Sequence, residues 1–230
     1  MGNVTDKAVS STSTSTLALT LRITEIFFSL QGETSRVGLP TVFVRLTGCP
    51  LRCGYCDTAY AFQGGESLTL EKILAEVTHY RTRHVTVTGG EPLAQKNCLA
   101  LLKALADRGY SVSLETSGAL DVSRVDARIS KILDIKTPGS GEAEKNLWTN
   151  LAHLTAQDEI KFVLCSAADY EWAKQALAER GLDQICAVLF SPSHQDLPAK
   201  ALAEWILRDQ LPVRMQVQLH KQLWGETPGH

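Results

Sequence analysis

The chain has 230 residues, of which 44% are hydrophobic, and its formal net charge is −2. This length suits one core, and no clustered basic face points to nucleic-acid binding. No apolar run approaches the roughly 20 residues of a membrane-spanning helix, and no secretory signal is recognisable. Six cysteines without a secretory context indicate reduced thiols. We therefore expect a cytoplasmic protein with neither a membrane nor a nucleic-acid partner.

Residues 1–20 include the run SSTSTST, which has almost nothing to bury, so we expect a disordered tail there and a single domain over 21–230. After the tail, β-branched runs typical of strands alternate with segments of helical spacing. Strands are expected at 21–30, 41–47, 84–88, 110–115, 131–135, 159–164, 185–190 and 213–219. Helices are expected at 67–81, 93–108, 142–154, 168–180 and 198–209.

This alternation predicts an α/β fold in which βαβ units form a parallel sheet. The strands are apolar along most of their length, which indicates that both faces of the sheet are covered. Eight complete units typically need about 250 residues, so an open, partial barrel of the (β/α)6 type fits this chain better. One extra strand is expected at the N-terminal end and one at the C-terminal end.

The segment GCPLRCGYCDT, residues 48–58, places Cys49, Cys53 and Cys56 within eight residues. So short a loop brings its sulfur atoms together, and three thiolates without a fourth suit an iron–sulfur cube with one iron open to a small chelating ligand. Structural zinc needs four ligands, and the other cysteines are isolated along the chain. A redox dithiol needs only one CxxC pair, which would give Cys49 no chemical role. The spacing favours an open cluster over zinc, and zinc over a disulfide.

Arg45 lies inside the strand expected at 41–47, where a charged side chain is costly to bury without a partner. One interpretation is an edge position with the guanidinium in water, or a structural ion pair. The other is a planar fork that holds the carboxylate of a substrate. The residues alone favour neither interpretation.

Motifs with unusual chemistry each follow an expected strand. They are the cysteine loop, GGEP at 89–92, ETSG at 115–118, DIKTPG at 134–139 and FSPSH at 190–194. The carboxyl ends of parallel strands share one rim in a βα fold, so these motifs are expected to meet there. The sequence therefore predicts a single site at that rim.

The motif CxxxCxxC, with Tyr55 before its third cysteine, and the GGEP that follows resemble the radical S-adenosylmethionine (radical SAM) superfamily. Within it, the chain is most similar to the 7-carboxy-7-deazaguanine synthase family of the queuosine pathway, from about Ile23 onward. The segments that carry this resemblance are SLQGE at 29–33, VFVRLTGCPLRCGYCDT at 42–58, TGGEP at 88–92, ETSG at 115–118 and QLHK at 218–221.

The resemblance implies a lyase that carries a 4Fe–4S cluster on Cys49, Cys53 and Cys56. S-adenosylmethionine would chelate the open iron, and its cleavage would release a 5′-deoxyadenosyl radical. That radical would take a hydrogen atom from 6-carboxy-5,6,7,8-tetrahydropterin, which contracts to 7-carboxy-7-deazaguanine with loss of ammonia. The S-adenosylmethionine would be regenerated. The family also implies an electron donor such as flavodoxin or ferredoxin, and a homodimer.

The same resemblance assigns roles to residues of the rim. Thr58 would ligate Mg²⁺, although a threonine there is also typical of a helix cap. The pterin would contact Leu30, Gln31, Gly32, Glu33, Arg45, Thr88 and His220. The S-adenosylmethionine would contact Tyr55, Cys56, Asp57, Gly90, Glu91, Ser117, Asp134, Ile135, Lys136 and Ser191. A strand-end ion pair remains an alternative for Asp134 and Lys136, and a structural role remains one for His220.

Two departures from the family pattern affect this site. Asp134-Ile135-Lys136 stands where many relatives have Ser-Pro-Lys, and nine residues follow Lys221 where relatives end sooner. The extension argues against a contact between the terminal carboxylate and the substrate. Two other functions remain as alternatives: a radical SAM activase that installs a glycyl radical on a partner protein, and a non-enzymatic module stabilised by zinc.

Overall fold

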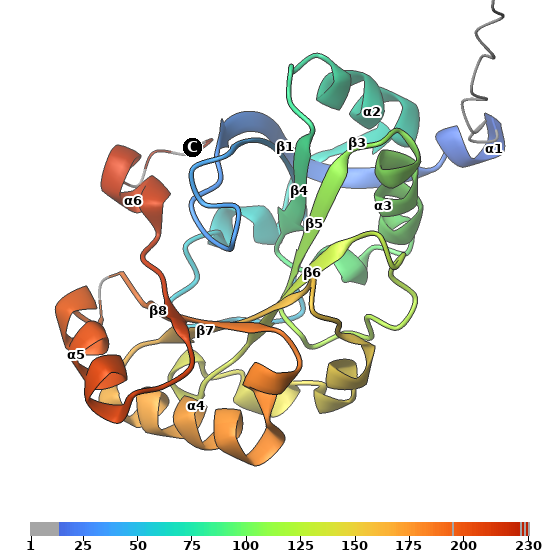
Figure 1. Ribbon diagram of the computed structural model, residues 1–230. Coiled ribbons are helices and arrows are strands. Elements are labelled where there is room, and N and C mark those ends of the chain that lie inside the picture. Colours follow the sequence, from blue (N-terminus) through green and yellow to red (C-terminus); the bar gives the residue numbers. More distant parts are fainter. Residues whose placement is uncertain (1–13, 195, 226, 228, 230) are drawn as a thin grey trace, which may run out of the picture.

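The computed structural model describes residues 14–194, 196–225, 227 and 229 (Figure 1). These residues form one sheet of nine strands, in the order β3-β1-β2-β4-β5-β6-β7-β8-β9. The strands are β1 (Thr20–Leu30), β2 (Pro40–Leu46), β3 (Glu66–Thr69), β4 (His84–Gly89), β5 (Ser111–Thr116), β6 (Ser130–Ile135), β7 (Glu159–Leu164), β8 (Ala187–Pro192) and β9 (Arg214–Met215). β1 pairs antiparallel with β2 and β3, and all the other pairs are parallel.

The sheet curves into an open partial barrel (Figure 1). Its six regular parallel strands are β2, β4, β5, β6, β7 and β8, so the predicted (β/α)6-type fold is confirmed. β1 and β9 are the extra strands expected at the two ends, and β3 is a further edge strand that the sequence did not predict.

Helices pack around this barrel, and most of them cover its outer face (Figure 1). They are α1 (Thr14–Leu17), α2 (Leu70–Thr78), α3 (Cys98–Asp107), α4 (Ala167–Arg180), α5 (Ala199–Asp209) and α6 (Leu219–Trp224). Short 3-10 turns lie in the loops between the strands and helices: η1 (Ala59–Phe62), η2 (Pro92–Ala94), η3 (Pro138–Ser140), η4 (Ala143–Lys145), η5 (Trp148–His153) and η6 (Leu182–Gln184).

The longest helix, α4, shows how local chemistry sets the limits of an element. Its first turn is capped by Ser166, whose side chain accepts a hydrogen bond from the backbone N–H of Asp169. It ends at Gly181, which adopts the left-handed conformation with φ 56°. The helices bury their apolar faces against the sheet, and one core cluster extends from Leu21 on β1 to Ile206 on α5.

Two predicted helices are shorter than expected. The helix predicted at 67–81 begins only at Leu70, because the preceding four residues pair with β1 as β3. The helix predicted at 93–108 is divided into η2 and α3. Gln95, between them, uses its side chain to bond the backbone of Arg22 and the carbonyl of Thr47, which ties this segment to β1 and the cysteine loop.

The helix predicted at 142–154 is wrong, since this segment forms the 3-10 turns η4 and η5. Asn146 bonds both the backbone N–H and the carbonyl of Lys136, at 2.9 and 2.8 Å. Asn150 donates to the carbonyls of Gly118 and Leu120. Both side chains satisfy strand-end loops, and such bonds compete with regular helix formation.

The closing strand predicted at 213–219 is also mostly wrong. Only Arg214–Met215 pairs with β8, and α6 begins at Leu219. The chain leaves the sheet because the side chain of Gln216 bonds the backbone N–H and carbonyl of Thr34, at 2.7 and 2.9 Å. The C-terminal segment is thereby directed across the turn after β1.

The tail predicted at 1–20 falls mostly on residues 1–13, which lie outside the described residues. Its described part is structured: α1 is followed by β1, which starts at Thr20. Leu17 and Leu19 pack against the core, and the carbonyl of Leu19 accepts from the N–H of Leu70 at 2.8 Å. Within the described ranges, every helix is too short or too polar to cross a bilayer.

Candidate active site

One cavity of about 570 Å³ lies at the carboxyl ends of the parallel strands. Its wall includes residues from β2, β4, β5, β6 and β7, the loop after β8, the cysteine loop and the start of α6. This volume is within the usual range for small-molecule sites, roughly 300–1,000 Å³. The motifs that follow the strands do meet at one rim, as the sequence predicted.

Most predicted site residues lie on this cavity. They are Leu30, Gln31, Gly32, Glu33, Arg45, Cys49, Cys53, Tyr55, Cys56, Asp57, Thr58, Thr88, Gly90, Ser117, Asp134, Lys136 and His220. Three others do not line it: Glu91, Ile135 and Ser191 are buried behind the wall, each at most 1% exposed.

The thiols of Cys49, Cys53 and Cys56 face the same cavity. Burial is the main reason why the pKa of each thiol is raised, to about 11 for Cys53, and neighbouring thiols add to the effect at Cys49 and Cys53. Lys136 opposes this rise at all three positions. Thiolates at this position therefore need additional positive charge, and a bound metal centre supplies it.

No group of three or more His, Cys, Asp or Glu side chains in the described ranges is arranged around a single-ion site. An iron–sulfur cube does not require such a group, because each cysteine of a cube binds a different iron.

Gly90 allows the turn after β4 to touch the cysteine loop. A Cβ atom on Gly90 would lie 2.4 Å from the carbonyl oxygen of Gly48 and 2.7 Å from Cβ of Cys49. The next residue, Glu91, donates its backbone N–H to the same carbonyl at 2.9 Å. The absent side chain at Gly90 thus sets the distance between the GGEP turn and the first cysteine.

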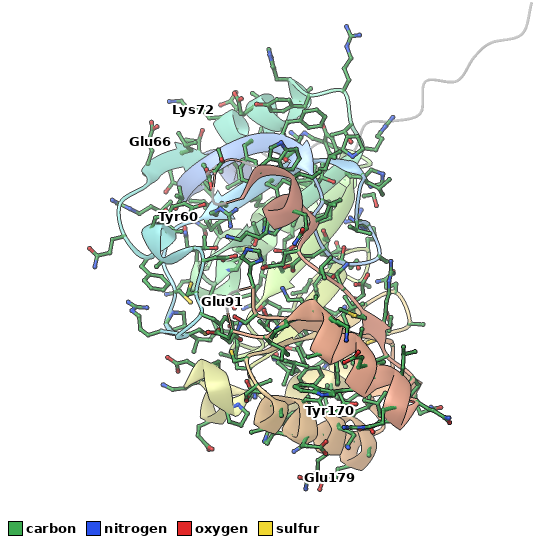
Figure 2. All side chains as sticks on the ribbon, turned by 90° about the vertical axis from the view of Figure 1, so that its left-hand side faces the viewer. Tyr60, Glu66, Lys72, Glu91, Tyr170 and Glu179 are labelled. Atoms are coloured by element: carbon green, nitrogen blue, oxygen red, sulfur yellow. The ribbon has the colours of Figure 1, made fainter. Side chains whose placement is uncertain are left out.

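Glu91 turns its carboxylate away from the cavity. It accepts from the backbone N–H of Leu93 at 2.9 Å, from the N–H of Ser117 at 2.7 Å and from the hydroxyl of Thr116 at 2.9 Å. Figure 2 shows Glu91 toward the centre of the molecule, while Glu66 lies at its periphery. The carboxylate joins the GGEP turn to the end of β5 and does not reach the cavity wall.

A chain of buried charges crosses the cavity floor. Lys161 lies 2.6 Å from Oε2 of Glu33 and 3.5 Å from Oδ2 of Asp134, and the latter oxygen also lies 3.1 Å from Lys136. Burial by itself lowers the pKa of Lys161, but Glu33 and Asp134 outweigh it and hold the pKa well above the usual value. The ion pair considered for Asp134 and Lys136 is therefore present.

Glu115 lies beside the predicted pterin residues. The hydroxyl of Thr88 donates to its Oε2 at 2.9 Å, and the amide of Gln31 donates to its Oε1 at 3.3 Å. Burial raises the pKa of Glu115, although Lys161 lowers it in part. This wall of the cavity offers a carboxyl group, an amide and a hydroxyl to a ligand.

Arg45 already has an anionic partner, because its Nε lies 2.7 Å from Oε1 of Glu25. Its guanidinium carbon lies 5.5 Å from the ring centroid of Phe27 and 5.9 Å from that of Tyr60. The structural ion pair considered for Arg45 is thus present. The pair uses only one of the guanidinium nitrogens, and the side chain still lines the cavity.

The residues that follow the third cysteine bring oxygen atoms to the cavity. The hydroxyl of Thr58 donates to Oδ1 of Asp57 at 2.7 Å, and it makes no cap hydrogen bond to η1. Burial opposes ionisation of Asp57, but Thr58, Lys221 and other cations outweigh it and lower the pKa of Asp57. Asp57 is therefore a carboxylate at neutral pH.

His220 closes the cavity from the C-terminal side. Its ring lies so close to Gly32 that a Cβ atom there would be 2.2 Å from Nδ1. The N–H of Leu219 donates to the carbonyl of Gly32 at 3.0 Å. Burial lowers the pKa of His220, in spite of Glu33 and Asp57, so the ring is neutral at pH 7.

Comparisons with known proteins identify the family of this chain. The model of the radical SAM superfamily matches residues 43–179. The chain is 48% identical over 208 residues to a 7-carboxy-7-deazaguanine synthase of Chlorobaculum tepidum, which covers 89% of this chain and 94% of the relative. It is 43% identical over 225 residues to the enzyme of the same name from Koribacter versatilis, with 91% and 100% coverage. The chain belongs to the 7-carboxy-7-deazaguanine synthase family of radical SAM enzymes.

Solved structures agree with this family assignment. The crystal structure of QueE from Escherichia coli is similar with a TM-score of 0.75 and 26% identity, and the match covers 92% of this chain and all of the other. Streptococcus suis SuiB, bound to S-adenosylmethionine, has a TM-score of 0.53 and 14% identity over 74% of this chain and 45% of that chain. The second match shows a shared fold. The family assignment favours a ring-contracting synthase over the activase and the zinc module.

The cofactors that radical SAM synthases use fit the chemistry of this cavity. Three thiols without a fourth face it, as an open cluster requires. The hydroxyl of Tyr55 and Oδ1 of Asp134, two residues that line the cavity, are buried and have no hydrogen-bond partner within the described part of the chain. Buried polar atoms are normally satisfied, so a polar ligand such as S-adenosylmethionine suits this wall of a 7-carboxy-7-deazaguanine synthase.

The sequence assigned no individual role to several residues of the synthase cavity, although Glu115 lies in the ETSG motif and Gln218 and Lys221 lie in QLHK. Glu115, Lys161, Gln218 and Lys221 all line the cavity. A detectable signal was present in the segment EIKFVL, where Lys161 interrupts a strand that is otherwise apolar between its ends. A charge at such an inward position needs a partner, which points to a buried ion pair or a ligand.

Proposed function

We propose that this chain converts 6-carboxy-5,6,7,8-tetrahydropterin to 7-carboxy-7-deazaguanine and ammonia, as a radical SAM lyase. The observation that carries the proposal is that the three thiols and the polar groups around Glu33, Arg45 and Glu115 share one cavity. Its volume of about 570 Å³ lies within the usual range of small-molecule sites, roughly 300–1,000 Å³. The relatives at 43–48% identity have the name of this activity and support the same function.

On this proposal, Cys49, Cys53 and Cys56 hold the 4Fe–4S cluster and leave one iron for S-adenosylmethionine. When bound, the cluster and S-adenosylmethionine supply the carbon radical that starts the reaction. The protein supplies position and charge. Tyr55 and Asp134 present unpaired polar atoms to the cofactor, and Gly90 keeps the loop after β4 against the first cysteine. Glu91 acts indirectly, by fixing Ser117 at the end of β5.

The substrate would occupy the side of the cavity formed by Gln31, Glu33, Arg45, Thr88 and His220. A pterin edge carries both donors and acceptors, so carboxylate, amide and hydroxyl groups are suitable partners. Arg45 supplies a cation for the 6-carboxylate, and its pair with Glu25 fixes the plane of the guanidinium. The neutral ring of His220 covers the substrate from the C-terminal side and excludes water.

We also propose a Mg²⁺ ion at Thr58. Hard cations prefer oxygen ligands, and the Thr58 hydroxyl lies beside the ionised carboxylate of Asp57 at the cavity wall. The ion would retain waters and bind the substrate carboxylate. Cluster reduction would need a carrier such as flavodoxin or ferredoxin, and an oxygen-labile cluster with free thiols suits a cytoplasmic location.

A homodimer is the assembly that we propose. Exposed apolar side chains on and near β1, among them Phe28 at 44% and Leu39 at 38% exposure, support an interface there. Light scattering of the purified protein measures the assembly directly, and a monomer mass at micromolar concentration would contradict a stable dimer.

The function is tested by anaerobic incubation of reconstituted protein with reductant, S-adenosylmethionine and the carboxylated pterin. We expect the deazapurine to appear, and none to form with a Cys56→Ala variant. Metal analysis of the same sample should give about four irons per chain. An iron-loaded wild-type protein that leaves the pterin unchanged would contradict the proposal, and one zinc per chain without iron would support the binding module.

A further inference from the structure

Lys161 lies where the two sides of the cavity meet. Its ammonium group is 2.6 Å from Glu33, on the side proposed for the pterin, and 3.5 Å from Asp134, on the side proposed for S-adenosylmethionine. The side chain of Lys161 is only 10% exposed. No other lysine of the described chain pairs with a carboxylate on each of the two sides.

We propose that Lys161 is a positioning residue that orients the carboxylates of both subsites, Glu33 for the pterin and Asp134 for S-adenosylmethionine. This inference rests on the proposed function and deepens it. Lys161 itself need not touch either ligand.

The contacts of Glu33 support the first half of the proposal. Lys161 donates to Oε2, and the amide of Gln218 donates to Oε1 at 2.8 Å. Both oxygens are therefore fixed in place, and each retains a further lone-pair direction for an N–H group of the pterin. Without the ammonium group, Glu33 would be a buried carboxylate without its counter-charge, which either becomes protonated or turns toward water.

The contacts of Asp134 support the second half. Its Oδ2 is shared by Lys136 and Lys161, whereas Oδ1 has no partner within the described residues. One oxygen is thus anchored and the other is left for a ligand. Since Lys136 is the closer of the two lysines, at 3.1 Å against 3.5 Å, Asp134 keeps one anchor when Lys161 is lost.

The sheet contains a matched control. Lys131 on β6 is also buried and also forms an ion pair, with Asp158 at 3.0 Å, but neither residue lines the cavity. Replacing Lys131 or Lys161 by methionine removes the ammonium group from a side chain that is 5% or 10% exposed, respectively. Both variants should be less stable than wild type, and only Lys161→Met should bind the pterin and S-adenosylmethionine more weakly.

The experiment measures equilibrium binding of the pterin and of S-adenosylmethionine to the anaerobic holoenzyme. Lys161→Met should raise the Kd of the pterin roughly 10- to 100-fold, the usual effect of losing a hydrogen bond to a charged group. The Kd of S-adenosylmethionine should rise by a smaller factor, and Lys131→Met should leave both constants at wild-type values. A wild-type pterin Kd for Lys161→Met, or equal increases in the two variants, would overturn the proposal.

A second variant tests whether Lys161 acts through Glu33, and it covers the case in which Lys161→Met fails to fold. Glu33→Gln combined with Lys161→Met removes both charges of the pair together, which buried pairs tolerate better than the loss of one partner. The double variant should bind pterin as Glu33→Gln does. Clearly weaker binding by the double variant would contradict the positioning role. A wild-type holoenzyme that does not bind the pterin would instead contradict the proposed function.

Discussion

At the scale of single residues, Glu115 shows what burial in this cavity does to a charge. Burial raises its pKa, so at intermediate pH the folded protein binds a proton that the unfolded chain has released. Stability therefore falls as pH rises from the unfolded value, about 4.3, to the folded pKa. The reaction site is built at a cost in stability near neutral pH.

Glu115→Gln should remove this pH dependence. We expect the variant to be more stable relative to wild type at pH 8 than at pH 5: the difference in the free energy of unfolding, variant minus wild type, should be larger at pH 8. Urea titrations at both pH values measure this difference. Asp126→Asn is the control, because hydrogen bonds from Arg128 lower the pKa of Asp126 to about 2, far below this range. The change in the free energy of unfolding caused by Asp126→Asn should be equal at pH 5 and pH 8. If the free energy of unfolding of Glu115→Gln differs from that of wild type by the same amount at pH 5 and pH 8, the pKa of Glu115 is not raised in this range.

Gly90→Ala tests the contact between the GGEP turn and the cysteine loop. A methyl group there meets backbone and Cys49 at less than 3 Å, so we expect a loss of about 1–3 kcal/mol in stability and poor cluster uptake. The measurement is iron per chain after anaerobic reconstitution. Gly54 lies in the cysteine loop itself, and a Cβ atom on it would be 4.0 Å from its nearest neighbour, the carbonyl oxygen of Gly139. The Gly54→Ala variant should therefore take up iron as wild type does. Equal uptake by both variants would contradict the packing role.

The sequence identified most residues of the cavity because its motifs follow strands, and strand ends share a rim. It could not show where each side chain points. Glu91 turns inward to Thr116 and Ser117, and Arg45 pairs with Glu25, whose position in sequence gives no hint of that contact. Lys161 was missed because its partners, more than 100 residues away in one case, come together only in the folded barrel.

At the scale of elements, the C-terminal segment closes the cavity through side chains rather than through a strand. Gln216 imitates a backbone partner by bonding both polar groups of Thr34, a residue held at φ 69°. The sequence predicted a strand here because its residues alternate. It predicted the parallel strands well, because their apolar runs depend on burial, and it failed at 142–154, where asparagine side chains replace helical hydrogen bonds.

Gln216→Ala should release this segment. It leaves the buried N–H of Thr34 without a partner, and the carbonyl of Thr34 keeps only the N–H of Val37 at 3.3 Å, so we expect a loss of about 1–3 kcal/mol in the free energy of unfolding. Hydrogen exchange should also accelerate at Thr34 and across α6. Gln175→Ala, on the exposed face of α4, should change stability by no more than about 0.5 kcal/mol. Unchanged exchange at Thr34 would show that Gln216 does not hold the segment.

At the scale of the whole molecule, we propose that residues 21–230 form a single domain, as the sequence led us to expect. One apolar cluster includes residues from β1 to α5, so the two ends of the sheet share a core. Thermal unfolding of the cluster-free protein should then show one transition, with calorimetric and van't Hoff enthalpies equal. Two separate transitions would contradict the single domain.

The proposed function depends on a cluster in which Cys49, Cys53 and Cys56 leave one iron free to bind S-adenosylmethionine. The direct measurement is the electron paramagnetic resonance spectrum of the reduced holoenzyme, before and after S-adenosylmethionine is added. We expect the cluster signal to change on addition, because the cofactor would become a ligand of the open iron. A fully iron-loaded protein whose spectrum is identical with and without saturating S-adenosylmethionine would contradict it.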